Sequence, residues 1–184
     1  MTTITTFTGI EFAPLSPRLE DIDIRDIAHG LSNLCRFSGQ CRKFYSVAEH
    51  SVFVSLLTPP KYALGALLHD ASEAYGLNDV AGPIKPFFPE YVQAENKLQG
   101  LVYLKWMING DEYMTAIKNA DRIALLYEQE WLFRGVLPHP FLWGWHPEGA
   151  KKLFEERFKE LTSASKSEES LHQERLAPVF YALA

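Results

Sequence analysis

Residues 61–75 read KYALGALLHDASEAY, and this stretch sets the interpretation of the whole chain. It follows Pro60, and a proline can occupy the first turn of a helix without losing a hydrogen bond. The first half of the stretch is apolar enough for a helix in the protein core. We therefore predict a core helix from Lys61 to about Tyr75, with His69 and Asp70 side by side near its end.

The other apolar residues also recur with the period of a helix. Ser46 and Glu49 form a capping box at the start of one helix, which Pro59 ends. Asp111, after a turn at Asn109-Gly110, can cap another. Because no alternating stretch of strand length is present, we predict an all-α bundle. Its helices are expected over residues 19–34, 46–58, 61–75, 89–107, 111–133 and 147–161, with a short last helix near Leu171.

Composition narrows the class of protein. The 184 residues suit a single domain, 1–184, with a mobile polar connection over residues 163–170. A formal net charge of −5 argues against a nucleic-acid partner, which needs a basic stripe. No apolar run approaches the roughly 18 residues of a membrane helix, and the N-terminus does not look like a secretory signal. The two cysteines, Cys35 and Cys41, suit reduced thiols, so we expect a cytoplasmic protein.

Three of the predicted helices carry polar residues of metal-binding type on their apolar faces. His50 follows Val47 by three residues and Asp121 follows Ile117 by four, so both are expected to face inward. The His69-Asp70 pair lies at the end of the core helix. Burying such groups costs free energy unless partners are present. One metal site with two histidine and two carboxylate ligands is the economical explanation.

Each of these residues taken alone has a simpler explanation. A single inward histidine such as His50 is usually a core residue with a hydrogen-bond partner. An inward aspartate such as Asp121 is more often the partner in an ion pair, and a His-Asp dipeptide is common by chance. The specificity of the metal prediction comes from the ordered set. Glu73, one helical turn after His69-Asp70, would then be near enough to orient or deprotonate a bound water.

In this order, the residues resemble the H…HD…D motif of the HD-domain phosphohydrolases. The similarity covers roughly residues 24–127 and points to a compact branch of that family. This branch contains bacterial deoxyribonucleoside 5′-nucleotidases and phage triphosphohydrolases that act on dATP. The motifs that carry the resemblance are Arg36-Phe37, Tyr45-Ser-Val-Ala-Glu-His-Ser51, Leu68-His-Asp-Ala-Ser-Glu73, Asp79 and Pro83-Ile-Lys85.

The resemblance implies an HD-type helical bundle around a metal that activates a water for phosphate-ester hydrolysis. The implied metal ligands are His50, His69, Asp70 and Asp121. An acid–base role is implied for Glu73 and Asp79. Phosphate contacts are expected from Arg36, Lys85 and Lys118, each of which could instead be a surface charge. Phe37 could stack on a base or sugar or simply pack in the core, and Pro83 and Ile84 could line a base pocket.

Mixed histidine and carboxylate ligation suits cobalt, manganese, zinc, iron or nickel better than calcium, and magnesium could enter as a second ion. The favoured substrate is dATP or another deoxynucleoside triphosphate, hydrolysed to deoxynucleoside and triphosphate, because three candidate cations are present. The alternatives are a 5′-nucleotidase acting on deoxynucleoside monophosphates, a phosphodiesterase acting on dinucleotides, and a metal-binding or nucleotide-binding module without turnover. We also expect a homo-oligomer, located in the host cytoplasm if the protein is encoded by a phage.

Overall fold

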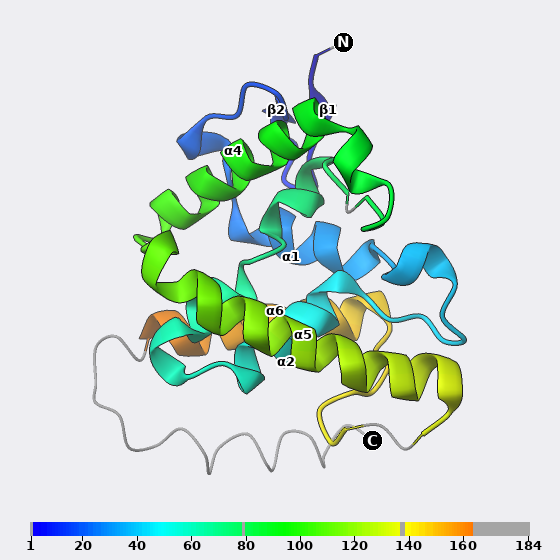
Figure 1. Ribbon diagram of the computed structural model, residues 1–184. Helices are drawn as coiled ribbons and strands as arrows, with labels where there is room; N and C mark the ends of the chain where they lie inside the picture. The colour runs from blue at the N-terminus through cyan, green and yellow to red at the C-terminus, as the bar shows by residue number, and fades with distance from the viewer. Residues whose placement is uncertain (1, 79, 137–138, 164–184) are drawn as a thin grey trace.

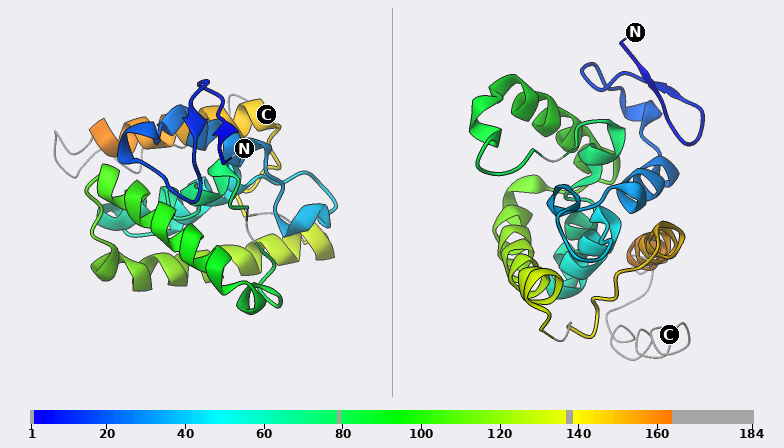
Figure 2. Two further views of the ribbon diagram at one scale, coloured as in Figure 1. Left: turned by 90° about the horizontal axis from the view of Figure 1, so that it is seen from above. Right: turned by 90° about the vertical axis from the view of Figure 1, so that its right-hand side faces the viewer.

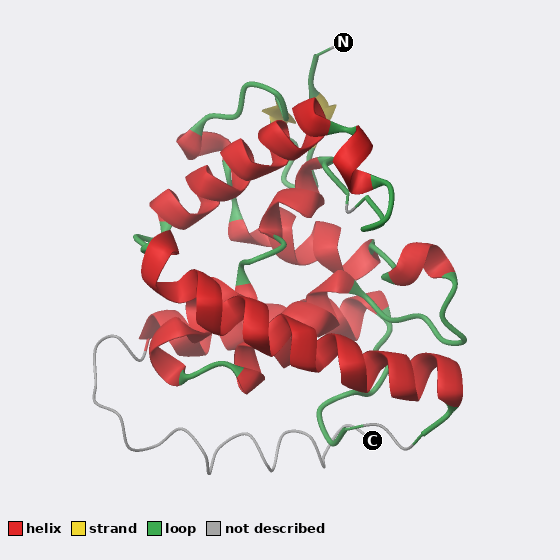
Figure 3. Cartoon of the chain, viewed as in Figure 1, coloured by secondary structure: helices red, strands yellow, loops and turns green. Residues whose placement is uncertain are grey.

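The computed structural model describes residues 2–78, 80–136 and 139–163. This part of the chain is mostly helical, as predicted, and its six α-helices pack into one bundle (Figures 1 and 3). The α-helices are α1 (Ile24–Asn33), α2 (Val47–Leu57), α3 (Ala63–Leu67), α4 (Pro89–Lys105), α5 (Gly110–Arg134) and α6 (Pro147–Ser163). None of the helices described is both long and apolar enough to cross a lipid bilayer.

A small antiparallel hairpin, which the sequence did not predict, precedes the bundle. Strand β1 (Ile4–Thr5) pairs with β2 (Glu11–Phe12), and Ile4 lies opposite Phe12. Phe12 is fully buried and stacks on Tyr75, with ring centroids 4.1 Å apart. The strands are too short to show an alternating pattern, and the hairpin is joined to the bundle by Phe12 and by two hydrogen bonds from Thr8 to the Asp26 carboxylate.

Helix α2 lies at the centre of the bundle, between α5 on one side and α1 and α6 on the other (Figure 2). Every residue from Val47 to Ser55 is buried. Such burial is expected of a helix that is apolar on nearly all sides. The central position predicted for the 61–75 segment therefore belongs to α2 instead.

Two clusters of apolar side chains meet at α2. The first joins the hairpin, α1, α4 and α6, and includes Phe12, Ile27, Leu31, Leu67, Leu98 and Phe154. The second lies between α2 and α5, and includes Tyr45, Phe53, Ile117, Ala124 and Leu132. Because α2 contributes to both clusters, its polar side chains lie between two apolar regions.

The prediction of one continuous helix over residues 61–75 is wrong. Helix α3 ends at Leu67, and a tighter 3₁₀ segment, η4 (Ala71–Tyr75), follows after a break at residues 68–70. The side-chain amide of Gln99, on α4, bridges this break. Its Nε2 donates to the Leu68 carbonyl at 2.7 Å, and its Oε1 accepts from the Ser72 amide at 3.2 Å. A side chain from another helix therefore satisfies backbone groups that the break leaves unpaired, which no local pattern can predict.

The helix starts follow the predicted capping only in part. Ser46 caps α2 as predicted, since its Oγ accepts from the Glu49 amide at 3.1 Å. Helix α5 begins at Gly110 with Asn109 at the cap, so the prediction that Asp111 caps it is wrong. The α1, α4 and α6 predictions are confirmed to within a few residues, apart from the separate turn at Leu19–Asp21. Asp79, the polar connection beyond Ser163 and the helix expected near Leu171 lie outside the described residues.

Gly30 permits the close approach of α1 to η4, and its replacement tests that packing. A Cβ added at Gly30 would lie 2.8 Å from the Cβ and 2.9 Å from the Cα of Ala74. We expect Gly30→Ala to lower the free energy of unfolding by about 1–2 kcal/mol, because overpacking outweighs the helix propensity gained. Gly100→Ala, on α4 with open space around it, should instead raise stability by about 0.5–1 kcal/mol. Urea unfolding of both variants measures this, and equal effects would contradict the packing argument.

Candidate metal centre

Three of the four predicted ligands converge from three different elements. His50 lies on α2, His69 in the break after α3, and Asp121 on α5, and one ligand atom of each lies within 4.8 Å of the others. Nε2 of His50 is 3.3 Å from Nε2 of His69 and 3.2 Å from Oδ1 of Asp121. Oδ2 of Asp70 is 3.3 Å from Nε2 of His69 and 3.7 Å from Nε2 of His50. Asp70 therefore borders the same group.

The opposite nitrogen of each imidazole faces an acceptor. Nδ1 of His50 lies 2.6 Å from Oε1 of Glu128, and Nδ1 of His69 lies 2.7 Å from the Ala66 carbonyl oxygen. A neutral histidine has one N–H, so both Nδ1 atoms are the donors and both Nε2 atoms carry lone pairs. Those lone pairs point at each other and at carboxylate oxygens. With the imidazoles neutral, the group could hold a metal ion through these lone pairs.

The charges of the cluster are strongly coupled. Burial and Arg36 lower the pKa of His50, but Glu128 and Asp121 outweigh them and raise it to about 9. Burial raises the pKa of Asp121, but His50 and His69 outweigh burial and lower that pKa to about 2. Without a metal, His50 is therefore protonated and donates to the surrounding acceptors. A metal bound at this group would displace that proton.

Glu128 is the functional candidate that the sequence interpretation missed. Its side chain is fully buried on α5, two turns after Asp121. Burial raises the pKa of Glu128, but His50 and Arg36 outweigh burial and lower it to about 2, so the group is a carboxylate. The buried residues of α5 include Ile117, Ala120, Ala124, Glu128 and Leu132, which follow one helical stripe. The position of Glu128 on this apolar stripe is the sequence signal that could have identified it.

Arg36 is held between two carboxylates. Its Nη2 lies 3.1 Å from Oε2 of Glu128, and its Nη1 lies 3.9 Å from Oδ2 of Asp70. The next residues, Phe37 and Ser38, have φ values of 54° and 51°, a conformation that non-glycine residues seldom adopt. Phe37 also packs edge to face on Phe133, with ring centroids 5.2 Å apart. The turn after Arg36 is therefore fixed both by strain and by packing.

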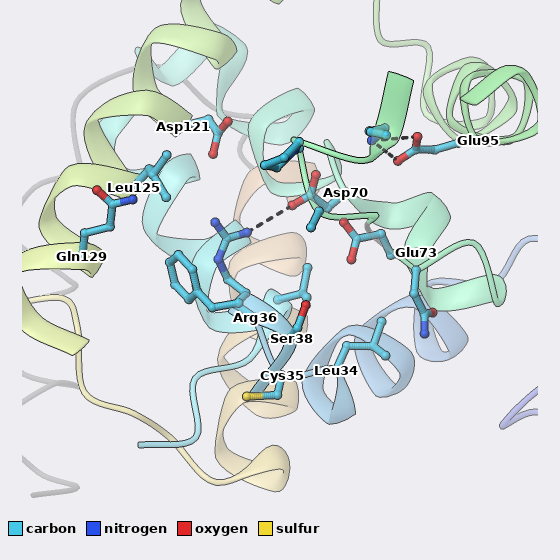
Figure 4. Close-up of a pocket in the computed structure, with 17 residues that line it drawn as sticks. Leu34, Cys35, Arg36, Ser38, Asp70, Glu73, Glu95, Asp121, Leu125 and Gln129 are labelled. Atoms are coloured by element: carbon cyan, nitrogen blue, oxygen red, sulfur yellow. Dashed lines mark hydrogen bonds and ion pairs between the residues drawn. The ribbon is translucent and has the colours of Figure 1, made fainter. Parts of the chain in front are cut away.

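A pocket of about 810 Å³ opens beside this cluster (Figure 4). Seven of the predicted site residues line it: Arg36, Phe37, Asp70, Glu73, Pro83, Lys85 and Asp121. Figure 4 shows the carboxylates of Asp121 and Asp70 on either side of the Arg36 guanidinium, with Glu73 beyond Asp70. His50 and His69 do not line the pocket. The pocket is thus open to the metal-binding group and also to an arginine.

Two predicted substrate contacts lie outside the lining of this pocket. Ile84 is half exposed, and Lys118 is exposed on α5. Lys85 lines the pocket, but its Nζ is 2.9 Å from Oε1 of Glu95. Lys118 and Asp121, three residues apart, lie on the same side of α5, but the Lys118 side chain is exposed and does not line the pocket.

Comparison with known proteins gives the family. No protein-family model matches the chain. Over 129 residues, 70% of this chain and 71% of its relative, it is 41% identical to YfdR, an uncharacterized protein of Escherichia coli strain K12. The chain belongs to the YfdR family. It is also 37% identical over 129 residues to the uncharacterized protein RCAP_rcc00048 of Rhodobacter capsulatus, a match that spans 63% of this chain and 65% of that relative.

A second buried carboxylate anchors the loop between α5 and α6 in this member of the YfdR family. Oε1 of Glu49 accepts hydrogen bonds from the amides of Trp143 and Gly144, and Oε2 accepts from the amide of Trp145, each at 2.8 Å. Burial raises the pKa of Glu49 to about 7, against the effect of the three amides. The Glu49 side chain therefore binds this loop instead of the Ser46 amide, so only the Ser46 half of the predicted capping box forms. Leu142 of this loop is buried in the second apolar cluster, so the loop packs against the bundle.

Asp121→Asn tests the metal-binding group with little risk to folding, because the Asp121 side chain is 44% exposed. We expect this variant to bind Co²⁺ or Mn²⁺ more weakly by at least the roughly 10- to 100-fold that loss of a ligand's hydrogen-bond partner costs. Isothermal titration of the metal-stripped protein measures this. Glu130→Gln, on the exposed face of the same helix, is the matched control and should keep the wild-type affinity. Equal binding by the two variants would remove Asp121 from the site.

Proposed function

We propose that this chain is a metal-dependent phosphohydrolase of the HD type that acts on deoxynucleotides. The observation that carries the proposal is the convergence of His50, His69 and Asp121 with both Nε2 lone pairs turned inward. The resemblance of the ordered set His50, His69-Asp70 and Asp121 to the HD motif adds the class of reaction. The pocket beside the group supplies room for a substrate the size of a nucleotide.

In this proposal the metal is held by His50, His69 and Asp121, with Asp70 as the fourth ligand. The donor set fits manganese, iron, cobalt, nickel or zinc, and magnesium remains the proposed second ion. A divalent ion bound there would lower the pKa of a water and polarise a phosphoryl oxygen. The protein's own contribution is to orient the substrate and to move protons.

Arg36 and Glu73 are the two side chains that we assign to the phosphate and to proton transfer. Arg36 presents its guanidinium to the pocket between Asp70 and Glu128, where it can bind phosphoryl oxygens. Glu73 is buried and lines the same pocket, and it is the proposed base for the attacking water. Asp79, outside the described residues, is the alternative acid or base that the resemblance suggests.

The cations around the pocket favour a monophosphate as the substrate, and hence a 5′-nucleotidase. The preference for triphosphate rested on three cations, Arg36, Lys85 and Lys118. Arg36 is paired with Glu128, Lys85 is paired with Glu95, and Lys118 does not line the pocket. Three phosphates carry more negative charge than this arrangement offsets. Phe37 and Leu125, with Gln129 beside them, offer one wall for the base.

Hydrolysis of dATP to deoxyadenosine and triphosphate is the second candidate. Lys118 is exposed on α5, three residues before Asp121, so a longer phosphate chain that leaves the pocket would pass near it. A metal-binding or nucleotide-binding module without turnover is the outcome if no phosphoester is cleaved. Assembly into a homo-oligomer also stays a prediction.

The substrate class is tested by product analysis. The purified protein is incubated with each deoxynucleoside mono- and triphosphate and with cobalt, manganese, zinc or magnesium in turn, and products are resolved by chromatography. We expect deoxynucleoside and orthophosphate from the monophosphates, abolished by chelation. Deoxyadenosine with intact triphosphate from dATP would establish the second candidate instead. No turnover of any substrate would contradict the proposed function.

Glu73→Gln separates the proposed base from the metal site. We expect turnover to fall by about 10²- to 10⁴-fold, the usual contribution of a general acid or base, while bound metal is unchanged. Glu90→Gln, on an exposed position of α4, controls for the loss of one charge. Steady-state kinetics and metal content are measured on the same samples. Undiminished turnover in Glu73→Gln would rule out this assignment.

A further inference from the structure

Glu128 connects the metal-binding group to the arginine of the pocket. Its Oε1 lies 2.6 Å from Nδ1 of His50 and accepts from the Tyr45 hydroxyl at 2.9 Å. Its Oε2 lies 3.1 Å from Nη2 of Arg36. The side chains of Glu128 and His50 are both completely buried, and Arg36 is 17% exposed. No water can replace these contacts without opening the bundle.

This geometry determines which nitrogen of His50 faces the metal-binding group. A carboxylate has no proton to give, so His50 must donate through Nδ1, and a metal can bind only through Nε2. Oε2 of the same carboxylate lies beside Nη2 of Arg36, and Nη1 of that guanidinium lies on the side of Asp70 and the pocket. One buried group thus orients two parts of the site that lie on different elements.

We propose that Glu128 is a positioning residue that sets the tautomer of His50 for metal binding and holds Arg36 for the phosphate. The proposal rests on the metal centre of the proposed function and goes beyond it by naming what aligns that centre. Glu128 touches neither metal nor substrate in this role. It acts through His50 and Arg36.

A merely structural role for Glu128 makes a different prediction. Buried ion pairs often serve only to avoid an unpaired charge, and replacing one partner then costs stability alone. Glu128→Gln distinguishes the two roles because it keeps the shape. If the amide nitrogen faces His50, Nδ1 must accept, and the proton moves to Nε2. If the amide oxygen faces His50, the amide nitrogen meets Arg36, donor against donor.

The experiment is titration of metal-stripped wild-type, Glu128→Gln and Tyr45→Phe proteins with Co²⁺, followed by calorimetry and by the visible absorption of the bound ion. Inorganic phosphate is then titrated into the cobalt-loaded proteins. We expect Glu128→Gln to lose about 10- to 100-fold in Co²⁺ affinity and to bind phosphate more weakly at saturating Co²⁺. Tyr45→Phe removes a hydrogen bond to the same Oε1 but keeps the carboxylate, so it should bind Co²⁺ like wild type.

Circular dichroism and urea unfolding identify the folded samples, and Glu128→Asp, which keeps the charge, replaces Glu128→Gln if the latter does not fold. Where both variants fold, a Co²⁺ affinity of Glu128→Asp between those of Glu128→Gln and wild type supports positioning. Where only Glu128→Asp folds, lowered Co²⁺ and phosphate affinities support positioning, and wild-type affinities overturn the proposal. Wild-type Co²⁺ and phosphate affinities in a folded Glu128→Gln would overturn the proposal and leave the metal centre intact. A wild-type protein that binds no Co²⁺, Mn²⁺ or Zn²⁺ would overturn the metal centre itself, and the role of Glu128 with it.

Discussion

The burial of helix α2 from Val47 to Ser55 is the constraint on which the rest of the structure depends. The helix carries Glu49, His50 and Ser55 where no solvent reaches, so each must be satisfied by another element. The Glu49 carboxylate accepts hydrogen bonds from three backbone amides of the loop before α6, and His50 pairs with the Glu128 carboxylate on α5. Ser55 donates to the Ala63 carbonyl and accepts from Nε of Arg157 on α6. The polar groups of one helix therefore decide how its neighbours are placed.

The candidate metal centre is the part of this arrangement that protein groups alone leave incomplete. Around Glu49 and Ser55 every donor meets an acceptor, whereas around Nε2 of His50 acceptors meet acceptors. The group of His50, His69 and Asp121 is instead one that could hold a cation. This contrast separates a candidate site from a core histidine. It also explains why the cluster sits on the most buried helix, where its ligands are held most rigidly.

Residues with a local signal were predicted well, and those that depend on distant partners were not. Ser46 caps α2 as its neighbours in sequence require, and the helical phase correctly brought His50 and Asp121 together. The break before His69 depends on Gln99, 30 residues further along the chain, so periodicity alone implied a continuous helix. Glu128 was not predicted because its partner His50 lies 78 residues away in the sequence. Lys118 shows the converse, since proximity in sequence to Asp121 does not place it in the pocket.

The partners of α2 are also far from it along the chain. Glu49 bonds to amides 94 to 96 residues away, and Ser55 bonds to Arg157 across 102 residues. Contacts this distant form slowly, because the loop between them must close before they contribute. A nascent chain emerging from the ribosome makes α2 long before residues 143–157 exist, so its buried charge has no partners during that interval. The centre of the molecule is thus synthesised early but is among the last parts to become native.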